Sequence, residues 1–377
     1  MKKQDLKNIL VPVDFSPMSE LAIETAQRLA RPSGATVHLV HVHEYFYPVG
    51  LMVPGAPVPP SMIAFCQDEA ERGRKQLAEL AASHGITITN CYVRNDVPVF
   101  NGVCKLAKQI GADLIVLQTH GHTGLARFFE GSHAERIVQH SPCPVLVARK
   151  QNRKTRRISA GAKAEGSIDS ILVPVDFSRS SFEALEYAID FADRVAARLI
   201  VLHVVNLDLA FTADGYAMCD LSVLMEDART SAEKQMQEFV RLAKFRGVKF
   251  ETAVKVASPT SEICDFADER DVDLIITATH GRTGLKHLLM GSVAEQMVRY
   301  ARQAVLVVPS HPETRTSKLS PPSRQGRQSI SQPARNRVAR AVPRSVAKGN
   351  RRLIEHPFPE RRKANKFRES HSRQDKD

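Results

Sequence analysis

Short, uninterrupted apolar segments alternate along this chain with longer stretches in which apolar residues recur every three or four positions. In the first half the apolar segments are residues 9–13, 37–42, 114–117 and 145–147. They are brief, rich in β-branched residues and, apart from two histidines in 37–42, apolar throughout, as is typical of strands buried on both faces of a parallel sheet. Alternation of such strands with helices predicts right-handed crossovers and a doubly wound open α/β sheet.

The stretches between the strands have helical periodicity. Apolar residues at helical spacing are Ala22, Ala26, Leu29 and Ala30, and later Ala184, Ala188, Phe191, Ala192 and Val195. Such spacing places them on one face of an amphipathic helix. Ser16 followed by Pro17 predicts a helix N-cap with proline at the first helical position.

Two segments of the chain occur twice. Residues 8–16 (NILVPVDFS) recur as 170–178 (SILVPVDFS), and residues 112–125 (ADLIVLQTHGHTGL) recur as 272–285 (VDLIITATHGRTGL). The spacing is nearly the same for both pairs, which predicts two full copies of one domain.

The repeats set the expected domain bounds. We expect the first domain at residues 5–150, a basic flexible linker at 151–167 and the second domain at 168–310. The segment 149–168 is basic, contains Gly, Ala and Ser and has no periodic apolar positions, as in a solvated linker.

The last part of the chain, residues 311–377, differs in composition. It carries 18 Lys and Arg against six Asp and Glu, which accounts for the whole net charge of +12. Few aliphatic residues and a high charge predict a disordered tail. Such a tail is either a solubilising extension or a sequence-independent contact with nucleic acid or another polyanion.

Composition indicates a globular protein of the cytoplasm. Hydrophobic residues make up 43% of the chain, and none of its apolar runs approaches the roughly 20 residues that cross a bilayer. Residues 1–5 lead straight into a predicted strand, without the apolar region of a signal peptide. We therefore expect no membrane association. The six cysteines are scattered without a CxxC pair, so we also expect no metal site.

Acidic residues stand where the first strand of each copy ends. In open α/β sheets ligands bind beyond the carboxyl ends of the strands, and Asp14 and Asp176 occupy that position. A carboxylate there can accept hydrogen bonds from a ribose or an adenine amine. An aspartate at the start of a loop is equally common as a turn or capping residue.

A glycine pattern follows a buried strand in each copy. Two glycines with nine residues between them precede a serine, at Gly121, Gly131 and Ser132 and again at Gly281, Gly291 and Ser292. Glycines let backbone amides approach an anion, and the helix that begins at the serine favours phosphate oxygens at its N-terminus. The pattern predicts a phosphate-binding turn.

Histidines flank this pattern at His120, His122 and His280. They have no carboxylate or cysteine partner at metal-binding spacing, and we interpret them as structural. The chain contains neither GxxxxGK[ST] nor GxGxxG, so a P-loop or a dinucleotide-binding turn has no support.

At these residues the chain resembles the universal stress protein family over residues 5–150 and 167–310. The likeness rests on the strand-ending aspartates, the Gly-nine-Gly-Ser pattern, and the order of the surrounding segments. It implies two five-stranded sheets of the adenine-nucleotide α-hydrolase type, with strand order 3-2-1-4-5 in each. It also implies that strands 145–147 and 305–308 pair across a pseudo-twofold axis as an intramolecular dimer, with a homodimer as a further option.

The resemblance also implies a role for each site residue. Asp14 and Asp176 would hold ribose or adenine, with Pro12 and Pro174 near the base and the backbones of Val42 and Val204 at its edge. The glycines and serines of the two Gly-nine-Gly-Ser patterns would contact phosphates.

The chain departs from the family pattern three residues before Gly121 and Gly281, where a glycine is expected. Gln118 and Ala278 stand there instead. Because Gln118 places a long side chain beside the expected ligand path, we expect nucleotide binding in the second domain in preference to the first.

The resulting hypothesis is a stress-response protein that binds ATP or AMP, with or without Mg²⁺, as a regulatory ligand and acts on a protein partner not yet known. The alternative is a nucleotide-free dimeric scaffold, with the tail contacting a polyanion. No general base is recognisable, so we expect no enzyme beyond slow ATP hydrolysis.

Overall fold

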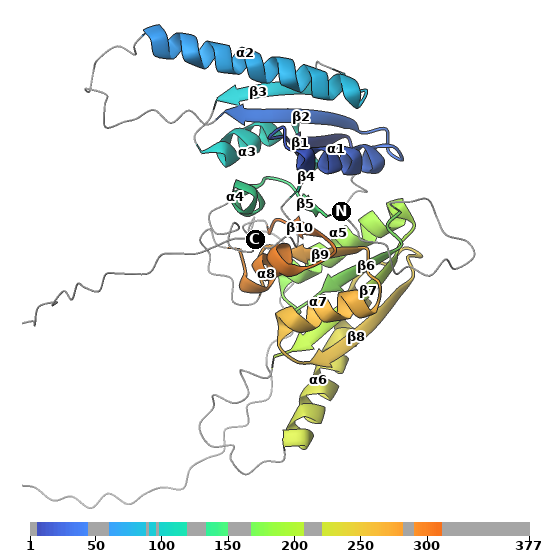
Figure 1. The fold of residues 1–377 in the computed structure, drawn as a ribbon. Helices are drawn as coiled ribbons and strands as arrows, with labels where there is room; N and C mark the ends of the chain where they lie inside the picture. The colour runs from blue at the N-terminus through green and yellow to red at the C-terminus, as the bar shows by residue number, and fades with distance from the viewer. Residues whose placement is uncertain are drawn as a thin grey trace, which may run out of the picture. The chain divides into compact units, whose positions relative to one another are not determined.

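The computed structural model describes ten strands and eight helices within the first 310 residues (Figure 1). The described residues are 6–43, 60–87, 90–95, 98–118, 133–149, 167–206, 221–281 and 290–310. The basic tail, whose predicted disorder and polyanion binding stay predictions, lies outside them.

Both repeats have the same order of elements. The first repeat contains β1 (Asn8–Pro12), α1 (Pro17–Ala30), β2 (Thr36–His43), α2 (Pro60–Ser83), β3 (Cys91–Asn95), α3 (Val99–Ile110), β4 (Leu114–Gln118), α4 (His133–His140) and β5 (Val145–Ala148). The second contains β6 (Ser170–Pro174), α5 (Arg179–Val195), β7 (Arg198–Val205), α6 (Leu221–Leu242), β8 (Phe250–Val256), α7 (Pro259–Glu269), β9 (Leu274–Ala278), α8 (Ser292–Tyr300) and β10 (Ala304–Val308).

The strands of each repeat are parallel and follow the predicted order. The described strands form one sheet, β3-β2-β1-β4-β5-β10-β9-β6-β7-β8, so each repeat has the order 3-2-1-4-5. In both repeats the first strand pairs with the second and the fourth, as Ile9 does with Val37 and Leu114. The prediction of a doubly wound parallel α/β fold is confirmed.

The two repeats meet at β5 and β10, the one antiparallel pair of the sheet among the described strands. Val145, Leu146 and Val147 face Val307, Leu306 and Val305. Leu146 and Leu306 are equivalent residues of the two repeats, so a pseudo-twofold axis passes through this pair. The pairing expected from the family resemblance is therefore present, and it joins the two predicted sheets into one of ten strands.

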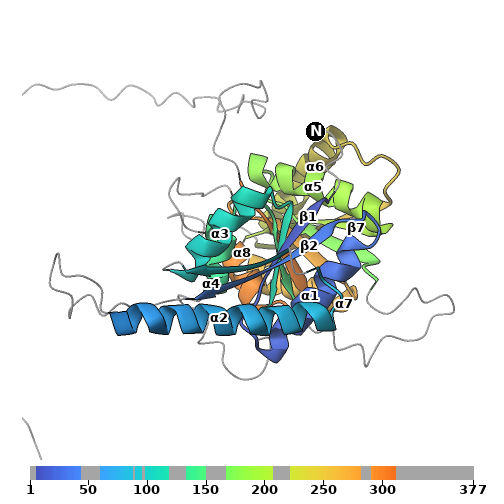
Figure 2. The same cartoon turned by 90° about the horizontal axis from the view of Figure 1, so that it is seen from above.

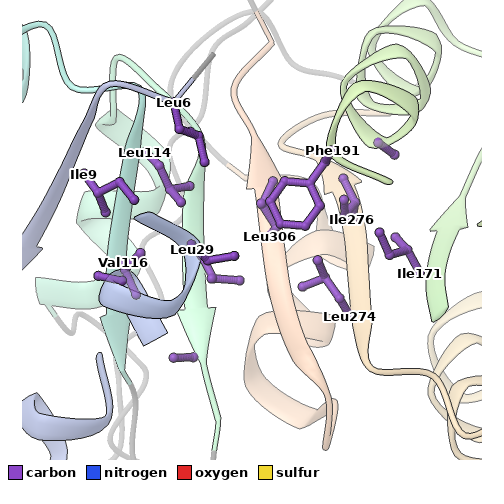
Figure 3. Packing of buried hydrophobic residues seen from close by; sticks show 14 of the residues in the cluster. Leu6, Ile9, Leu29, Leu114, Val116, Ile171, Phe191, Leu274, Ile276 and Leu306 are labelled. Carbon is purple, nitrogen blue, oxygen red and sulfur yellow. The ribbon is translucent and has the colours of Figure 1, made fainter. Parts of the chain in front are cut away.

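Helices cover both faces of this sheet. Figure 2 shows α2 and α3 on opposite sides of β2. Buried residues of α1, α2, α5 and α6 pack on one face, and those of α3, α4, α7 and α8 pack on the other. Each apolar layer contains residues of both repeats, as Figure 3 shows for Ile9 and Leu114 of the first and Ile171 and Leu274 of the second.

The first helix of each repeat begins as its sequence predicts. Ser16 is the N-cap of α1 and Pro17 is its first residue, and the periodic residues from Ala22 to Ala30 are buried. The hydroxyl of Ser178 caps α5 by accepting a hydrogen bond from the Ser181 amide at 3.1 Å. Ser16 makes no such side-chain cap, because its hydroxyl donates to Asp14 instead.

Within the described residues, the helices are too short or too polar to cross a membrane.

Candidate functional site

The two strand-ending aspartates lie on matching turns between the first strand and the first helix of each repeat. Asp14 and Asp176 are each followed by a phenylalanine with a left-handed backbone, with φ of 60° at Phe15 and 61° at Phe177. Bulky residues rarely adopt this conformation, and a sparsely populated one costs about 1–3 kcal/mol. Tertiary contacts must therefore hold the turn.

Histidines of the second strand supply those contacts. His41 bonds through Nδ1 to the Val13 carbonyl oxygen at 2.8 Å, and its ring centroid lies 4.3 Å from that of Phe15. His203 does the same for Val175 at 2.7 Å, with its ring 4.2 Å from Phe177. Sequence reasoning did not assign a role to these phenylalanines and histidines, although both recur at equivalent positions.

The carboxylate of Asp14 is held by its own turn. Oδ1 accepts from the Ser16 amide at 3.0 Å, the Ser16 hydroxyl at 2.6 Å and the Ser19 hydroxyl at 2.7 Å. Partial burial raises the pKa of Asp14, but these hydrogen bonds outweigh it, so the pKa is lowered from 3.8. The charged carboxylate of the first repeat already has three donors.

The equivalent serines bond differently in the second repeat. The Ser178 amide donates to Oδ1 of Asp176 at 3.0 Å, as in the first repeat. The Ser178 hydroxyl accepts from the Ser181 amide, however, and the Ser181 hydroxyl donates to the Ser178 carbonyl oxygen at 2.9 Å. Both hydroxyls that bind Asp14 in the first repeat thus serve the helix start in the second.

Gly281, from the glycine pattern after β9, lies directly against Asp176. A methyl group on Gly281 would come within 2.6 Å of Oδ2 of Asp176 and 3.5 Å of its Cγ. Only glycine therefore fits beside this carboxylate without displacing it. The structure brings together two predicted site residues that lie far apart in the chain.

Gly291 lies next to Gly281 and caps α8. Its amide donates to the Thr279 carbonyl oxygen at 2.8 Å, and a methyl group on it would lie 3.8 Å from the amide nitrogen of Gly281. The first intrahelical bond runs from the Glu295 amide to the Gly291 carbonyl oxygen at 2.9 Å. The amides of residues 292–294 precede that bond, so they have no acceptor within the helix, as at the helix N-termini that bind anions in other proteins.

Thr279, buried at the end of β9, anchors the start of this glycine loop. Its amide donates to the Val308 carbonyl oxygen at 3.0 Å, and its hydroxyl bonds to Ser310 Oγ at 3.1 Å and accepts from the Ser310 amide at 3.0 Å. The His280 ring bonds through Nδ1 to the same hydroxyl at 2.9 Å. This contact agrees with the structural role that we assigned to His280.

The remaining predicted residues lie at the carboxyl ends of neighbouring strands. Pro12 and Pro174 end β1 and β6, two residues before the aspartates. Val42 and Val204 lie near the ends of β2 and β7 and are partly exposed. All four therefore lie at the edge of the sheet where ligands of doubly wound folds bind.

The two departures from the family pattern have different surroundings. Gln118, at the end of β4, points its amide nitrogen at Met18 Sδ at 4.0 Å, and its buried Oε1 has no hydrogen-bond partner among the described residues. Ala278, the equivalent residue of β9, is buried and has no polar side-chain group. The long polar side chain thus lies in the first repeat alone.

Three predicted residues, Gly121, Gly131 and Ser132, lie outside the described residues. The described part of the chain contains no cluster of three or more histidine, cysteine or acidic side chains that could hold a metal ion. What the second repeat offers is a carboxylate, a close backbone approach at two glycines and a helix N-terminus, which together suit a ligand with hydroxyl and anionic groups.

Comparison with known proteins identifies the family. The model of the universal stress protein family matches residues 5–149 and 167–309, most of the chain. The chain belongs to the universal stress protein family. It carries two domains of this family in tandem.

Relatives that match the whole tandem and relatives that match a single repeat both support the assignment. A universal stress protein of Mycolicibacterium smegmatis is 26% identical over 310 residues, which cover 80% of this chain and 96% of that protein. One from Methanocaldococcus jannaschii is 32% identical over 146 residues, which cover 38% of this chain and 84% of that protein. The crystal structure of a universal stress protein from Archaeoglobus fulgidus covers 81% of this chain and 97% of its own, with a TM-score of 0.54 and 18% identity, and so shares the fold.

Proposed function

We propose that this universal stress protein is a regulatory protein that binds an adenine nucleotide, ATP or AMP, in its second domain. The observation that carries the proposal is the contact between Gly281 and Asp176. A methyl group on Gly281 would lie 2.6 Å from Oδ2 of Asp176, so the backbone there passes too close to the carboxylate for any side chain to fit between them. The carboxylate suits ribose hydroxyls or the adenine amine, and the nearby N-terminus of α8 suits phosphates.

Different residues of the second domain would contact different parts of the nucleotide. Asp176 would hold the ribose or the base, with Pro174 and the backbone of Val204 beside the base. Gly281, Gly291 and Ser292 would contact the phosphates, with or without Mg²⁺. Because the proposed contacts are backbone amides and one carboxylate, we assign a binding function and no chemical step.

The first domain is the weaker candidate for a nucleotide. Asp14, Pro12 and Val42 lie at the equivalent strand ends, but Oδ1 of Asp14 already accepts from two serine hydroxyls and an amide. Gln118 adds a long side chain at the end of β4. We therefore expect one nucleotide per chain, with the first domain acting as the structural partner of the second.

Isothermal titration of Mg²⁺ and ATP, or of AMP, into the full chain tests the proposal. We expect binding with one site per chain, lost in Asp176→Ala and kept in the matched variant Asp14→Ala. A ligand that binds only the folded state also raises the melting temperature. No binding heat and no thermal shift would instead favour the nucleotide-free scaffold.

The location in the cytoplasm, a homodimer, the protein partner and a tail contact with nucleic acid stay predictions. The tail contact would be weak at moderate salt and abolished by deletion of residues 314–377.

A further inference from the structure

Arg149 is a buried cation at the junction of the two repeats. It directly follows β5, and only 8% of its surface is exposed. Arg149 is the last but one residue of the expected first domain and also the first residue of the basic segment 149–168, whose composition is that of a solvated linker, but its own side chain is buried. Burial lowers the pKa of the Arg149 guanidinium, because removal from water disfavours the charged form.

The guanidinium is directed at a helix of the other repeat. Nη2 of Arg149 donates a hydrogen bond to the carbonyl oxygen of Val298, in the last turn of α8. Carbonyls of a last turn lack intrahelical donors, and this end of a helix carries partial negative charge, so a cation there is stabilising. Nε of Arg149 has no hydrogen-bond partner among the described residues, so the bond from Nη2 to Val298 offsets part of the cost of burying the charge.

The pairing of β5 with β10 explains why this contact forms. Because the two strands are antiparallel, the end of β5 lies beside the start of β10, and three residues separate β10 from the end of α8. The equivalent position in the second repeat is Pro309, which has no hydrogen-bond donor in its side chain or backbone. Pro309 therefore cannot give α4 the contact that Arg149 gives α8.

The opposite end of α8 is the anion-binding turn of the second domain. The helix has nine residues, about 13 Å at 1.5 Å per residue. Its N-cap Gly291 lies beside Gly281, which in turn lies against Asp176, and its last turn contacts Arg149. A short rigid helix held at its end by the first repeat therefore has its first turn held as well.

We propose that Arg149 is a positioning residue for the anion site of the second domain, so that both repeats build this site. The inference rests on the proposed nucleotide site and deepens it. By thermodynamic linkage, a ligand at the start of α8 also strengthens the contact between the repeats. The first domain thus contributes to nucleotide binding without holding a nucleotide.

Three variants of the full chain test this inference. Arg149→Met keeps most of the side-chain volume and removes the donors, and Arg149→Lys keeps the charge. Arg302→Met is the matched control, because Arg302 lies in the same connection between α8 and β10 but has a side chain that is 69% exposed and pairs with Asp268. All three are titrated with Mg²⁺ and ATP, and their melting temperatures are recorded.

We expect Arg149→Met to weaken ATP binding about tenfold, Arg149→Lys to weaken it less, and Arg302→Met to leave it within about twofold. A lower melting temperature with unchanged ATP affinity in Arg149→Met would overturn the inference, because the role would then be structural. An equal loss of affinity in Arg302→Met would overturn it too, since any loss of positive charge would then suffice.

Hydrogen exchange separates this inference from the proposed function. In ligand-free protein, we expect the amides of residues 292–295 to exchange faster in Arg149→Met than in Arg302→Met. If the native chain binds no ATP, the proposed function fails, while faster exchange still supports the positioning role. Equal exchange in the two variants refutes it. If Arg149→Met does not fold, Arg149→Lys is compared with Arg302→Lys by the same two measurements.

Discussion

Replacing Gly281 by alanine tests the geometry of the site directly. The added methyl group would lie 2.6 Å from Oδ2 of Asp176, about 0.8 Å short of the 3.4 Å at which ordinary contact begins. Gly281 has no positive φ, so an alanine is not excluded by backbone conformation. The clash with the carboxylate is therefore the effect to be measured.

The loss of stability and of affinity in Gly281→Ala depends on how far the Asp176 carboxylate is displaced. Forcing an extra carbon into a filled space costs about 1–3 kcal/mol, and about 2 kcal/mol corresponds to roughly 4–8 °C in melting temperature for a domain of this size. A carboxylate displaced by about 0.8 Å also loses its hydrogen bond to the ligand, and a charged hydrogen bond contributes about 1.5–3 kcal/mol. We expect ATP affinity to fall roughly 10- to 100-fold.

Thermal unfolding and titration of Gly281→Ala, alone and with Asp176→Ala, provide the assay. Gly291→Ala is the control for thermal unfolding alone, because its methyl group would lie no closer than 3.4 Å to a neighbour; its affinity is not compared, since Gly291 is itself a proposed phosphate contact. In the Asp176→Ala background the alanine at Gly281 should cost no stability, since the atom that it strikes is gone. An equal loss of stability in both backgrounds, or unchanged affinity in the single variant, would refute the reasoning.

Two further predictions concern helix ends and pH. Ala196 is the C-cap of α5 and has a left-handed backbone with φ of 55°, so Ala196→Gly should raise the free energy of unfolding by about 0.5–1 kcal/mol, measured with denaturant. Gly111, the C-cap of α3, has φ of 60°, so Gly111→Ala should lower it by a similar amount, and the opposite signs would contradict the assignment of strain. Because the pKa of Asp14 is lowered in the folded state, its carboxylate contributes stability above pH 3.8, and this contribution is lost as the pH falls through the folded-state pKa. The difference in the free energy of unfolding between the native chain and Asp14→Asn should therefore be constant near neutral pH and disappear in acid. A difference that persists in acid would show that the hydrogen bonds from Ser16 and Ser19 do not depend on the charge.

Much of the fold could be predicted from local pattern. Apolar runs such as residues 114–117 are buried on both faces, and β4 accordingly lies inside the sheet. The family resemblance implied a fifth strand at this edge, but the apolar pattern did not locate β3 (Cys91–Asn95), because its residues alternate weakly and one side of the strand faces no neighbour. Its place depends on pairing with β2, which no local signal encodes.

The candidate site was predicted in part. The motif identified Asp176, Gly281 and Gly291 as site residues, and their proximity now has a physical basis in the contact between the first two. The left-handed turn at Phe177 could not be predicted, because the preference of phenylalanine is against it. The rings of His203, which bonds to the Val175 carbonyl oxygen, and of Phe239 pack against Phe177 and stabilise the turn.

The sequence by itself determined the duplication, the strand and helix order of each repeat and the residues at the strand ends, because periodicity and repeated motifs are local properties of the chain. Only the tertiary structure decided which side chains of one repeat contact the other repeat. Arg149 begins a basic segment whose composition is that of a solvated linker, yet the antiparallel pairing of β5 and β10 brings its side chain to the end of α8 and buries it. The two copies also differ beside the aspartates. Residues 9–16 and 171–178 are identical, but Pro17 and Met18 stand where the second repeat has Arg179 and Ser180, and the serine hydroxyls that bond to Asp14 have equivalents that bond at the start of α5.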